Sequence, residues 1–251
     1  MTEDEVVGLA KALGLLTPSQ RDWVKGVIAQ FQLPHKFVQN PKSDCIRPAV
    51  VERLGDVLRI HHAFSRQPLS KDRFEYALEL CLNQAGDSAA LVKSRTNRGH
   101  DITISGLPVS LKTEAAANIR EDVIHVSKWM ELGRGEWVLP RLRDLFLEHM
   151  QSYARIFTLR CLQPGPTHYF YELVEIPKPL MQEARNCEFK IMEDSRQNPK
   201  PGYGYVYDEH GQLKFELYFD GGTERKLQIR QIRKSLCIVH AAWDFDSAPL
   251  E

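Results

Sequence analysis

The stretch that decides the fold is Asp101-Ile102-Thr103-Ile104-Ser105-Gly106-Leu107-Pro108-Val109-Ser110-Leu111-Lys112-Thr113-Glu114. Ile102–Ile104 and Val109–Thr113 have the composition of short strands, and Gly-Leu-Pro between them predicts a turn. We therefore expect a β-hairpin with an acid before its first strand. Because side chains alternate along a strand, Ser110, Lys112 and Glu114 are expected on one face of the second strand.

An acid beside a lysine on a hairpin suits the hydrolysis of a phosphodiester. Mg²⁺ lowers the pKa of the attacking water and neutralises charge on the phosphate. It prefers oxygen ligands and usually takes one or two protein carboxylates. Asp101 is the expected first ligand, and the Leu111 carbonyl is a further one. Lys112 is expected to orient the water or stabilise the transition state, so the hairpin predicts a magnesium-dependent nuclease.

Ser110 stands where this kind of motif usually carries a second acid, and a hydroxyl is a poor magnesium ligand. Two acids are candidates for the missing ligand: Glu114, one pleat beyond Lys112, and Glu75 on the preceding helix. Glu75 lies at the edge of the apolar stripe predicted for Lys71–Gln84. The pattern Asp-x(8)-Ser-x-Lys is weak by itself, and its alternative interpretation is an exposed hairpin with a solvated ion pair.

The flanking sequence changes from helical to strand periodicity near Ile102. Residues 1 to about 90 have the spacing of helices, with one segment beginning at Thr17-Pro18 and two further ones at Val50–Phe64 and Lys71–Gln84. Strands are expected at Arg155–Leu162 and Tyr169–Ile176, after a helix over roughly Pro140–Tyr153. These patterns predict an α/β fold in which helices flank a central mixed β-sheet.

The last fifty residues have the pattern of a β-meander, with strands at Tyr203–Tyr207, Gln212–Phe219 and Glu224–Ile232. We expect one domain over 1–251. Within it, 1–90 form a helical region, 91–195 a catalytic α/β core, and 196–251 a β-rich region that reads DNA.

The final predicted strand is strongly basic, although the net charge of the chain is zero. Its outward face carries Lys226, Gln228 and Arg230, while Leu227 and Ile229 face the core. Arginine and lysine recognise the O6 and N7 atoms of guanine in the major groove. The side chains expected to read bases are Arg225, Lys226, Gln228 and Arg230, and those expected to hold phosphates are Arg233, Lys234 and Lys128. The alternative for each is an ordinary surface residue.

Composition narrows the class of protein further. The five cysteines are widely spaced and form no Cys-x-x-Cys pair, which argues against a zinc ribbon or a disulfide framework. The start Met-Thr-Glu-Asp-Glu lacks the features of a signal peptide, and no run approaches 18 apolar residues. A cytoplasmic protein without membrane contact is expected.

Several longer runs resemble the SmaI-type type II restriction endonucleases, which belong to the PD-(D/E)xK nuclease superfamily. They include Gly99–Ile104, Leu111–Ala116, His125–Trp137, Arg155–Arg160, Pro199–Tyr205, Tyr218–Gly222 and Glu224–Ile229. The resemblance implies a restriction-endonuclease-like core around the mixed sheet. It further implies Mg²⁺-dependent cleavage of duplex DNA that leaves 5′-phosphate and 3′-hydroxyl ends. It also implies the target CCCGGG, cut at its centre to give blunt ends.

The resemblance also bears on single residues. Asp101 matches the acid of the family and Lys112 its lysine, and Glu75 has a counterpart there. A small residue at the position of Ser110 is shared, so Ser110 is not an inactivating loss. Glu75 is therefore favoured over Glu114 as the second ligand. A palindromic target implies a homodimer that reads it through its own twofold symmetry.

Two other functions remain open on the sequence. One is a repair nuclease or a mismatch-dependent nicking nuclease of the same fold. The other is a catalytically silent DNA-binding protein, for which Ser110 is the argument.

Overall fold

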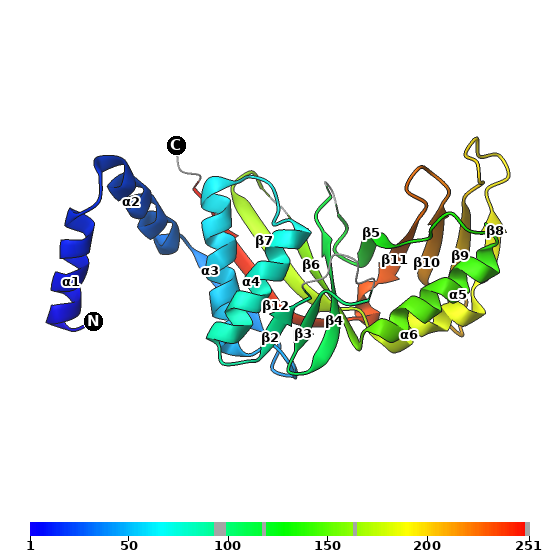
Figure 1. Cartoon of the computed structure of the whole chain (residues 1–251), viewed down its shortest axis with the longest axis horizontal. Helices are drawn as coiled ribbons and strands as arrows, with labels where there is room; N and C mark the ends of the chain where they lie inside the picture. The colour runs from blue at the N-terminus through cyan, green and yellow to red at the C-terminus, as the bar shows by residue number, and fades with distance from the viewer. Residues whose placement is uncertain (93–98, 117–118, 163–164, 249–251) are drawn as a thin grey trace.

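The computed structural model describes residues 1–92, 99–116, 119–162 and 165–248. Within these residues two β-sheets lie one after the other along the molecule (Figure 1). The large sheet has the order β1 (His35–Gln39), β12 (Ile238–Asp246), β7 (His168–Glu175), β6 (Arg155–Leu162), β4 (Leu107–Glu114), β3 (Ile102–Ile104) and β2 (Ala89–Leu91). Its strands β4 and β6 are parallel, whereas the neighbours on either side pair antiparallel. The prediction of an α/β fold with a mixed sheet is confirmed.

Helices α3 (Pro48–Phe64) and α4 (Lys71–Gln84) cover one face of the large sheet (Figure 1). Helix α4 begins after Ser70, whose hydroxyl accepts a hydrogen bond from the Arg73 amide as an N-cap. Its apolar stripe, including Phe74 and Leu78, is buried against sheet residues such as Leu111. This packing fixes the first turn of α4 beside the β3–β4 hairpin.

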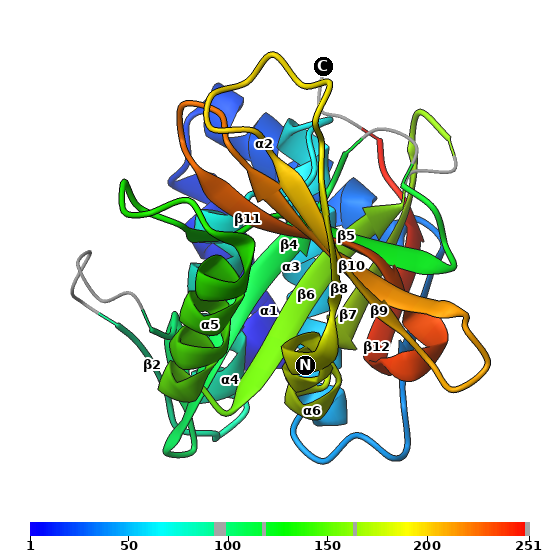
Figure 2. The same cartoon turned by 90° about the vertical axis from the view of Figure 1, so that its right-hand side faces the viewer.

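The small sheet is antiparallel and has its own core. Its order is β5 (Val123–Glu131), β11 (Lys226–Arg233), β10 (Leu213–Asp220), β9 (Gly202–Tyr207) and β8 (Glu188–Ile191). Helices α5 (Leu139–His149) and α6 (Lys178–Gln182) lie along one face, nearest the viewer in Figure 2. Short 3₁₀ helices follow at Met150–Ser152, Glu183–Asn186 and Lys234–Leu236. The predicted C-terminal meander is confirmed as β9–β10–β11.

Some predicted details were wrong. The hairpin turn is Ser105-Gly106, not Gly-Leu-Pro, because Ile104 pairs directly with Leu107. Both turn residues have positive φ, 48° and 83°, which a two-residue turn of this hand requires. Strand β1 also lies inside the region that was expected to be helical.

Strands β5 and β12 were not predicted. Each lies in the other sheet from most of the strands in its part of the sequence. Strand β5 comes from residues 91–195 but lies in the small sheet, and β12 comes from 196–251 but lies in the large sheet. Each sheet therefore contains strands from both of these predicted regions. The expected single domain stays a prediction.

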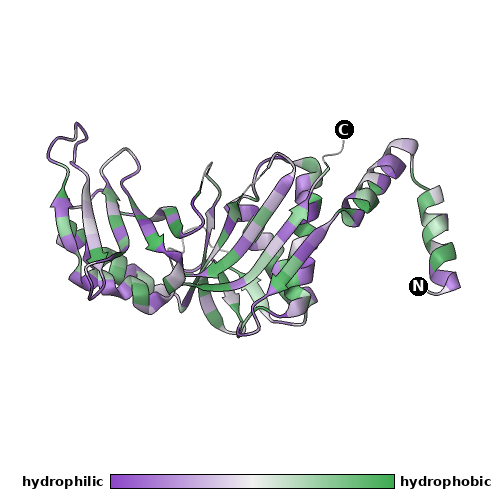
Figure 3. Cartoon of the chain, turned by 180° about the vertical axis from the view of Figure 1, so that it is seen from behind, coloured by the Kyte–Doolittle hydropathy of each residue, from purple (hydrophilic) through white to green (hydrophobic). Residues whose placement is uncertain are grey.

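Two N-terminal helices precede the large sheet. Helices α1 (Glu3–Gly14) and α2 (Pro18–Gln32) both begin with capping boxes, at Thr2 and Thr17. Helix α2 contacts α3, where Trp23 stacks on Phe64 with ring centroids 4.9 Å apart. Helix α1 buries none of its residues and stands away from the sheets, and much of its ribbon has the colour of hydrophobic residues (Figure 3). Among the described residues no helix is long and apolar enough to cross a bilayer; the cytoplasmic location stays a prediction.

Candidate active site

The β3–β4 hairpin brings Asp101 against the backbone of β4. The Asp101 amide donates to the Val109 carbonyl at 3.0 Å, which fixes the residue at the start of β3. Its carboxylate oxygen Oδ2 accepts from the Leu111 amide at 2.6 Å and from the Ser110 hydroxyl at 3.2 Å. The acid and the lysine-bearing strand thus meet, as the pattern of the hairpin predicts.

Lys112 lies in the same group of side chains. Its ammonium group donates to Ser110 Oγ at 2.9 Å and lies 5.9 Å from the centroid of the Trp129 ring. The side chain is only 8% exposed, and this burial lowers the pKa of Lys112 to about 8. Ser110 therefore links the lysine to Asp101 through one hydroxyl, which accepts from one side chain and donates to the other.

Helix α4 supplies a second carboxylate and an unpredicted cation. Lys71 Nζ donates to Asp101 Oδ1 at 2.8 Å and also contacts Glu75 Oε1. Glu75 and Asp101, from different elements, thus share one ammonium group. Lys71 was missed by the sequence reasoning, although its spacing of four residues from Glu75 on a predicted helix was a usable signal. We call Lys71, Glu75, Asp101, Ser110 and Lys112 the open cluster, because its outer side chains are partly exposed.

Burial and charge act in opposite directions on the two carboxylates. Burial tends to raise the pKa of Asp101, but the charges of Lys112 and Lys71 outweigh it and hold that pKa below its ordinary value. For Glu75 burial prevails over the attraction of Lys71, so its pKa lies above the ordinary value. Burial and the neighbouring charges thus shift the pKa values of the two carboxylates in opposite directions.

Glu114 belongs to a different group of side chains. Its Oε1 accepts from the His125 amide at 2.8 Å, and its Oε2 accepts from Arg160 Nε at 2.6 Å. Arg160 also donates to Glu172 at 2.9 Å, and Glu172 accepts from Lys234 at 2.8 Å. We call these four side chains, Glu114, Arg160, Glu172 and Lys234, the closed cluster. Both carboxylate oxygens of Glu114 already have partners there, whereas Glu75 faces the same cation as Asp101.

The open cluster has the donors that a hard divalent ion prefers. The carboxylates of Glu75 and Asp101 offer oxygen atoms, and the Leu111 backbone lies against Asp101. The Lys71 ammonium group between the two carboxylates shows that this gap accepts a cation. The residues therefore fit Mg²⁺, which takes oxygen ligands from few carboxylates and keeps several waters.

The predicted base-reading residues lie on β11 and its turn. Arg230 donates to Gln228 Oε1 at 3.0 and 2.8 Å and lies 3.7 Å above the Tyr218 ring. Lys226 pairs with Glu224 at 3.3 Å, and Arg225, with a positive φ of 42°, lies over the ring of Trp137. The inward face is confirmed, since Leu227 and Ile229 are fully buried. The outward position of Gln228 was wrong, because its side chain is only 8% exposed and is held between Arg230 and Asp220.

The predicted phosphate-binding residues have acidic partners at 2.7–2.9 Å. Arg233 donates to Asp208, and Lys128 on β5 donates to Glu131. Lys234 donates to Glu172 at 2.8 Å in the closed cluster. The side chain of Lys128 is 47% exposed, whereas those of Arg233 and Lys234 are partly buried. Their role in holding phosphates stays a prediction.

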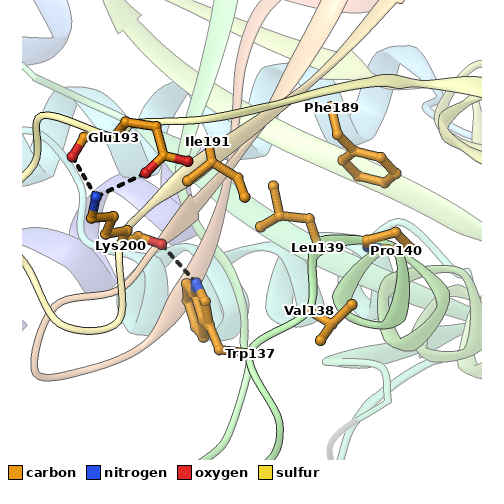
Figure 4. A pocket seen from close by; sticks show the side chains of 8 residues that line it. All are labelled: Trp137, Val138, Leu139, Pro140, Phe189, Ile191, Glu193 and Lys200. Atoms are coloured by element: carbon orange, nitrogen blue, oxygen red, sulfur yellow. Dashed lines mark hydrogen bonds and ion pairs between the residues drawn. The ribbon is translucent and has the colours of Figure 1, made fainter.

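A surface pocket connects the end of the catalytic strand with the reading strand. Its lining includes Thr113 and Glu114 on β4, His125 on β5, and Glu216 and Arg230 on β10 and β11. A different pocket lies between α5 and β8, where Trp137 donates to the Lys200 carbonyl at 2.8 Å (Figure 4). No residue of the open cluster lines this second pocket.

One further group of possible metal ligands is found among the described residues: Asp44, Cys45 and His240. Arg155 donates to both oxygens of Asp44, at 3.0 and 2.8 Å, and so already supplies the positive charge. His240 Nε2 contacts Glu175 at 2.9 Å. The group ties the loop after β1 to the large sheet.

A mixed sheet with two carboxylates and a buried lysine beside one hairpin, next to a basic strand, defines the class: a DNA-cleaving phosphodiester hydrolase. A family model described as SmaI, type II site-specific deoxyribonuclease, matches residues 9–245. The chain belongs to this family and is a type II restriction endonuclease.

A curated relative supports the same assignment. The type II restriction enzyme SmaI of Serratia marcescens is 49% identical over 240 residues, covering 94% of this chain and 95% of the relative. No solved structure matches the chain. Enzymes of this class generally need a divalent metal ion, and their substrate is DNA.

Proposed function

We propose that the enzyme cuts both strands of duplex DNA in a Mg²⁺-dependent reaction at the palindrome CCCGGG. We propose a cut at the centre, which gives blunt ends with 5′-phosphate and 3′-hydroxyl groups. The observation that carries the proposal is the meeting of Asp101, Glu75 and Lys112 beside one hairpin. The target comes from the resemblance to the SmaI-type enzymes, and the high identity to SmaI supports it.

The residues of the open cluster have separate roles in this proposal. Asp101 and Glu75, with the Leu111 carbonyl, would hold Mg²⁺, which when bound supplies a lower pKa for water and charge neutralisation at the phosphate. Lys112, held by Ser110 and by the Trp129 ring, places a positive charge where the phosphate gains negative charge. Ser110 donates a hydrogen bond to Asp101 and accepts one from Lys112, and so is proposed to fix the positions of these two side chains relative to each other. Glu114, with both oxygens engaged, is proposed to fix the end of β4 rather than to bind the metal.

The small sheet is proposed to read the sequence. Arg230 is held flat between Gln228 and Tyr218, so its guanidinium group loses little freedom on meeting a guanine. Arg225, Lys226 and Gln228 are proposed to contact neighbouring bases. Arg233 and Lys128 are proposed to position the backbone through phosphates.

The test is cleavage of a plasmid with a single CCCGGG site in Mg²⁺, followed by sequencing of the ends. The control plasmid differs only in one base pair of that site, and a second control contains EDTA. We expect linear product with blunt ends from the first plasmid alone. Accumulation of open circles without linear product would instead indicate a nicking nuclease, and cutting of the control plasmid would overturn the target.

A homodimer is proposed because each chain supplies one open cluster, whereas a palindrome has two scissile bonds. Mixed dimers of the natural chain and D101N should therefore cut one strand of the site only. Open-circular product that rises with the share of D101N in refolded mixtures is the expected result. If the amount of linear product simply followed the amount of natural chain, and no open circles formed, the proposed dimer would be contradicted.

A further inference from the structure

We propose that Lys71 is an internal cation of the metal site. Its ammonium group neutralises Glu75 and Asp101 and holds them together while no divalent ion is bound, and it leaves the gap between them when Mg²⁺ binds. Lys71 thereby sets the affinity of the protein for the metal. The inference depends on the proposed function, since it takes that gap as the metal site.

The first argument is the geometry of the shared ammonium group. Lys71 Nζ contacts Glu75, four residues along α4, and lies 2.8 Å from Asp101 Oδ1, thirty residues along the chain. The helix alone would explain a pair with Glu75 but not the second contact. Lys71 therefore bridges the helix to the hairpin at the atoms that are proposed to bind the metal.

The second argument is the position of Lys71 in its helix. Lys71 is the first residue of α4 and directly follows the N-cap Ser70. The amide groups at a helix N-terminus carry partial positive charge, so a lysine is unfavourable there by itself. The two carboxylates provide the compensation.

The third argument is charge. In the open cluster two carboxylates face two ammonium groups, so the charges balance without a metal. A divalent ion and an ammonium group at the same two oxygens would repel each other strongly, because like charges only a few ångströms apart are little screened by the solvent. One cation must leave when the other enters.

The two lysines differ in their freedom to leave. Lys112 is 8% exposed, and Ser110 and the Trp129 ring hold it. The side chain of Lys71 is 38% exposed and has a flexible stem that can carry its charge into water. Lys71 is therefore the cation that exchanges with the metal, and it acts as a positioning residue for both carboxylates.

The test compares metal binding by the natural chain and K71M, without DNA, using Mn²⁺ as the probe because it shares the oxygen ligands of Mg²⁺. The EPR signal of free Mn²⁺ measures the dissociation constant. We expect K71M to bind Mn²⁺ roughly tenfold more tightly, since one competing ion pair is removed. The neutral K71Q should behave in the same way, whereas K71R keeps the charge and should bind as weakly as the natural chain.

A second measurement reports on the state without metal. In EDTA the Tm of K71M should fall by about 2–4 °C, because two half-buried carboxylates lose their shared partner. The matched control is K25M, which removes a lysine paired with Asp22 on the exposed face of α2. K25M should change neither Mn²⁺ affinity nor the Tm in EDTA.

The outcomes separate the two proposals. If the natural chain binds Mn²⁺ and the neutral variants bind it equally or less tightly, the role of Lys71 is overturned and the metal site stands. If neither the natural chain nor any variant binds Mn²⁺, the metal site and the role of Lys71 both fail. Tighter binding by K71M and K71Q, but not by K71R, supports the exchange.

Discussion

The open and closed clusters begin two residues apart on the same face of β4, yet they are built for opposite purposes. In the open cluster Asp101 and Glu75 are 23% and 19% exposed and share a lysine that can move. In the closed cluster Glu114 and Arg160 are 5% and 0% exposed, and the arginine is fixed by five hydrogen bonds. The comparison teaches that neighbouring carboxylates can be held very differently: Glu114 by a fully buried, fixed arginine, and Asp101 and Glu75 by a lysine that is 38% exposed.

The largest effect is expected from the loss of Asp101. D101N removes one charge from the open cluster without changing its shape, so cleavage of the single-site plasmid should slow by about 10³-fold or more. K112A should have a similar effect. Binding of a CCCGGG duplex, measured by fluorescence anisotropy in Ca²⁺, should stay within a few-fold. Full cleavage by either variant would show that the chemistry does not occur in the open cluster.

The closed cluster should instead determine stability. R160M leaves Glu114 and Glu172 buried without their shared cation, which should lower the free energy of unfolding by about 3–5 kcal/mol. Urea denaturation followed by circular dichroism measures this loss. The matched control is R120M, whose exposed pair with Asp122 should contribute at most about 1 kcal/mol. Equal losses in the two variants would remove the distinction between the clusters.

Replacing each of the two candidate acids by glutamine tests which of them binds the metal. E75Q should reduce the cleavage rate at limiting Mg²⁺ by about 10–100-fold, as when a group that supports a bound metal is removed. Excess Mg²⁺ should restore part of the rate. E114Q should leave the metal dependence of cleavage unchanged and lower stability instead. The opposite pattern would assign the second metal ligand to Glu114.

The smallest effects are expected on the small sheet. R230A should reduce the discrimination between CCCGGG and a duplex with one altered G·C pair by about 1–3 kcal/mol. R233A should weaken binding to both duplexes equally, because a phosphate contact carries no sequence information. Competition binding at a fixed salt concentration distinguishes the two. Unchanged discrimination in R230A would remove that arginine from the reading surface.

Local patterns predicted much of the site. The hairpin, the buried stripe of α4 and the meander β9–β10–β11 all follow from periodicity and turn residues over short stretches. The contacts of Asp101 with Ser110 and with the backbone of β4 follow from the hairpin itself.

Long-range partners could not be predicted. β12 has alternating apolar residues, but nothing in its sequence indicates that it pairs with β1 and β7 in the large sheet. In the same way, the local pattern left both Glu114 and Glu75 as candidates, and only the resemblance favoured Glu75. Their partners, Arg160 and Lys71, became apparent only in the fold. The turn was predicted at Gly106–Pro108 and lies at Ser105-Gly106. Proline is usually a turn residue, whereas here Pro108 lies in β4.

The place of β12 between β1 and β7 has a consequence for biosynthesis. Residues 35–39 pair with residues 241–245, so β1 has no neighbouring strand until about two hundred more residues have left the ribosome. Contacts so distant in sequence form slowly, because a long loop must close first. The large sheet therefore reaches its full width late, and truncation before Ile238 would leave the edges of β1 and β7 bare and open to aggregation.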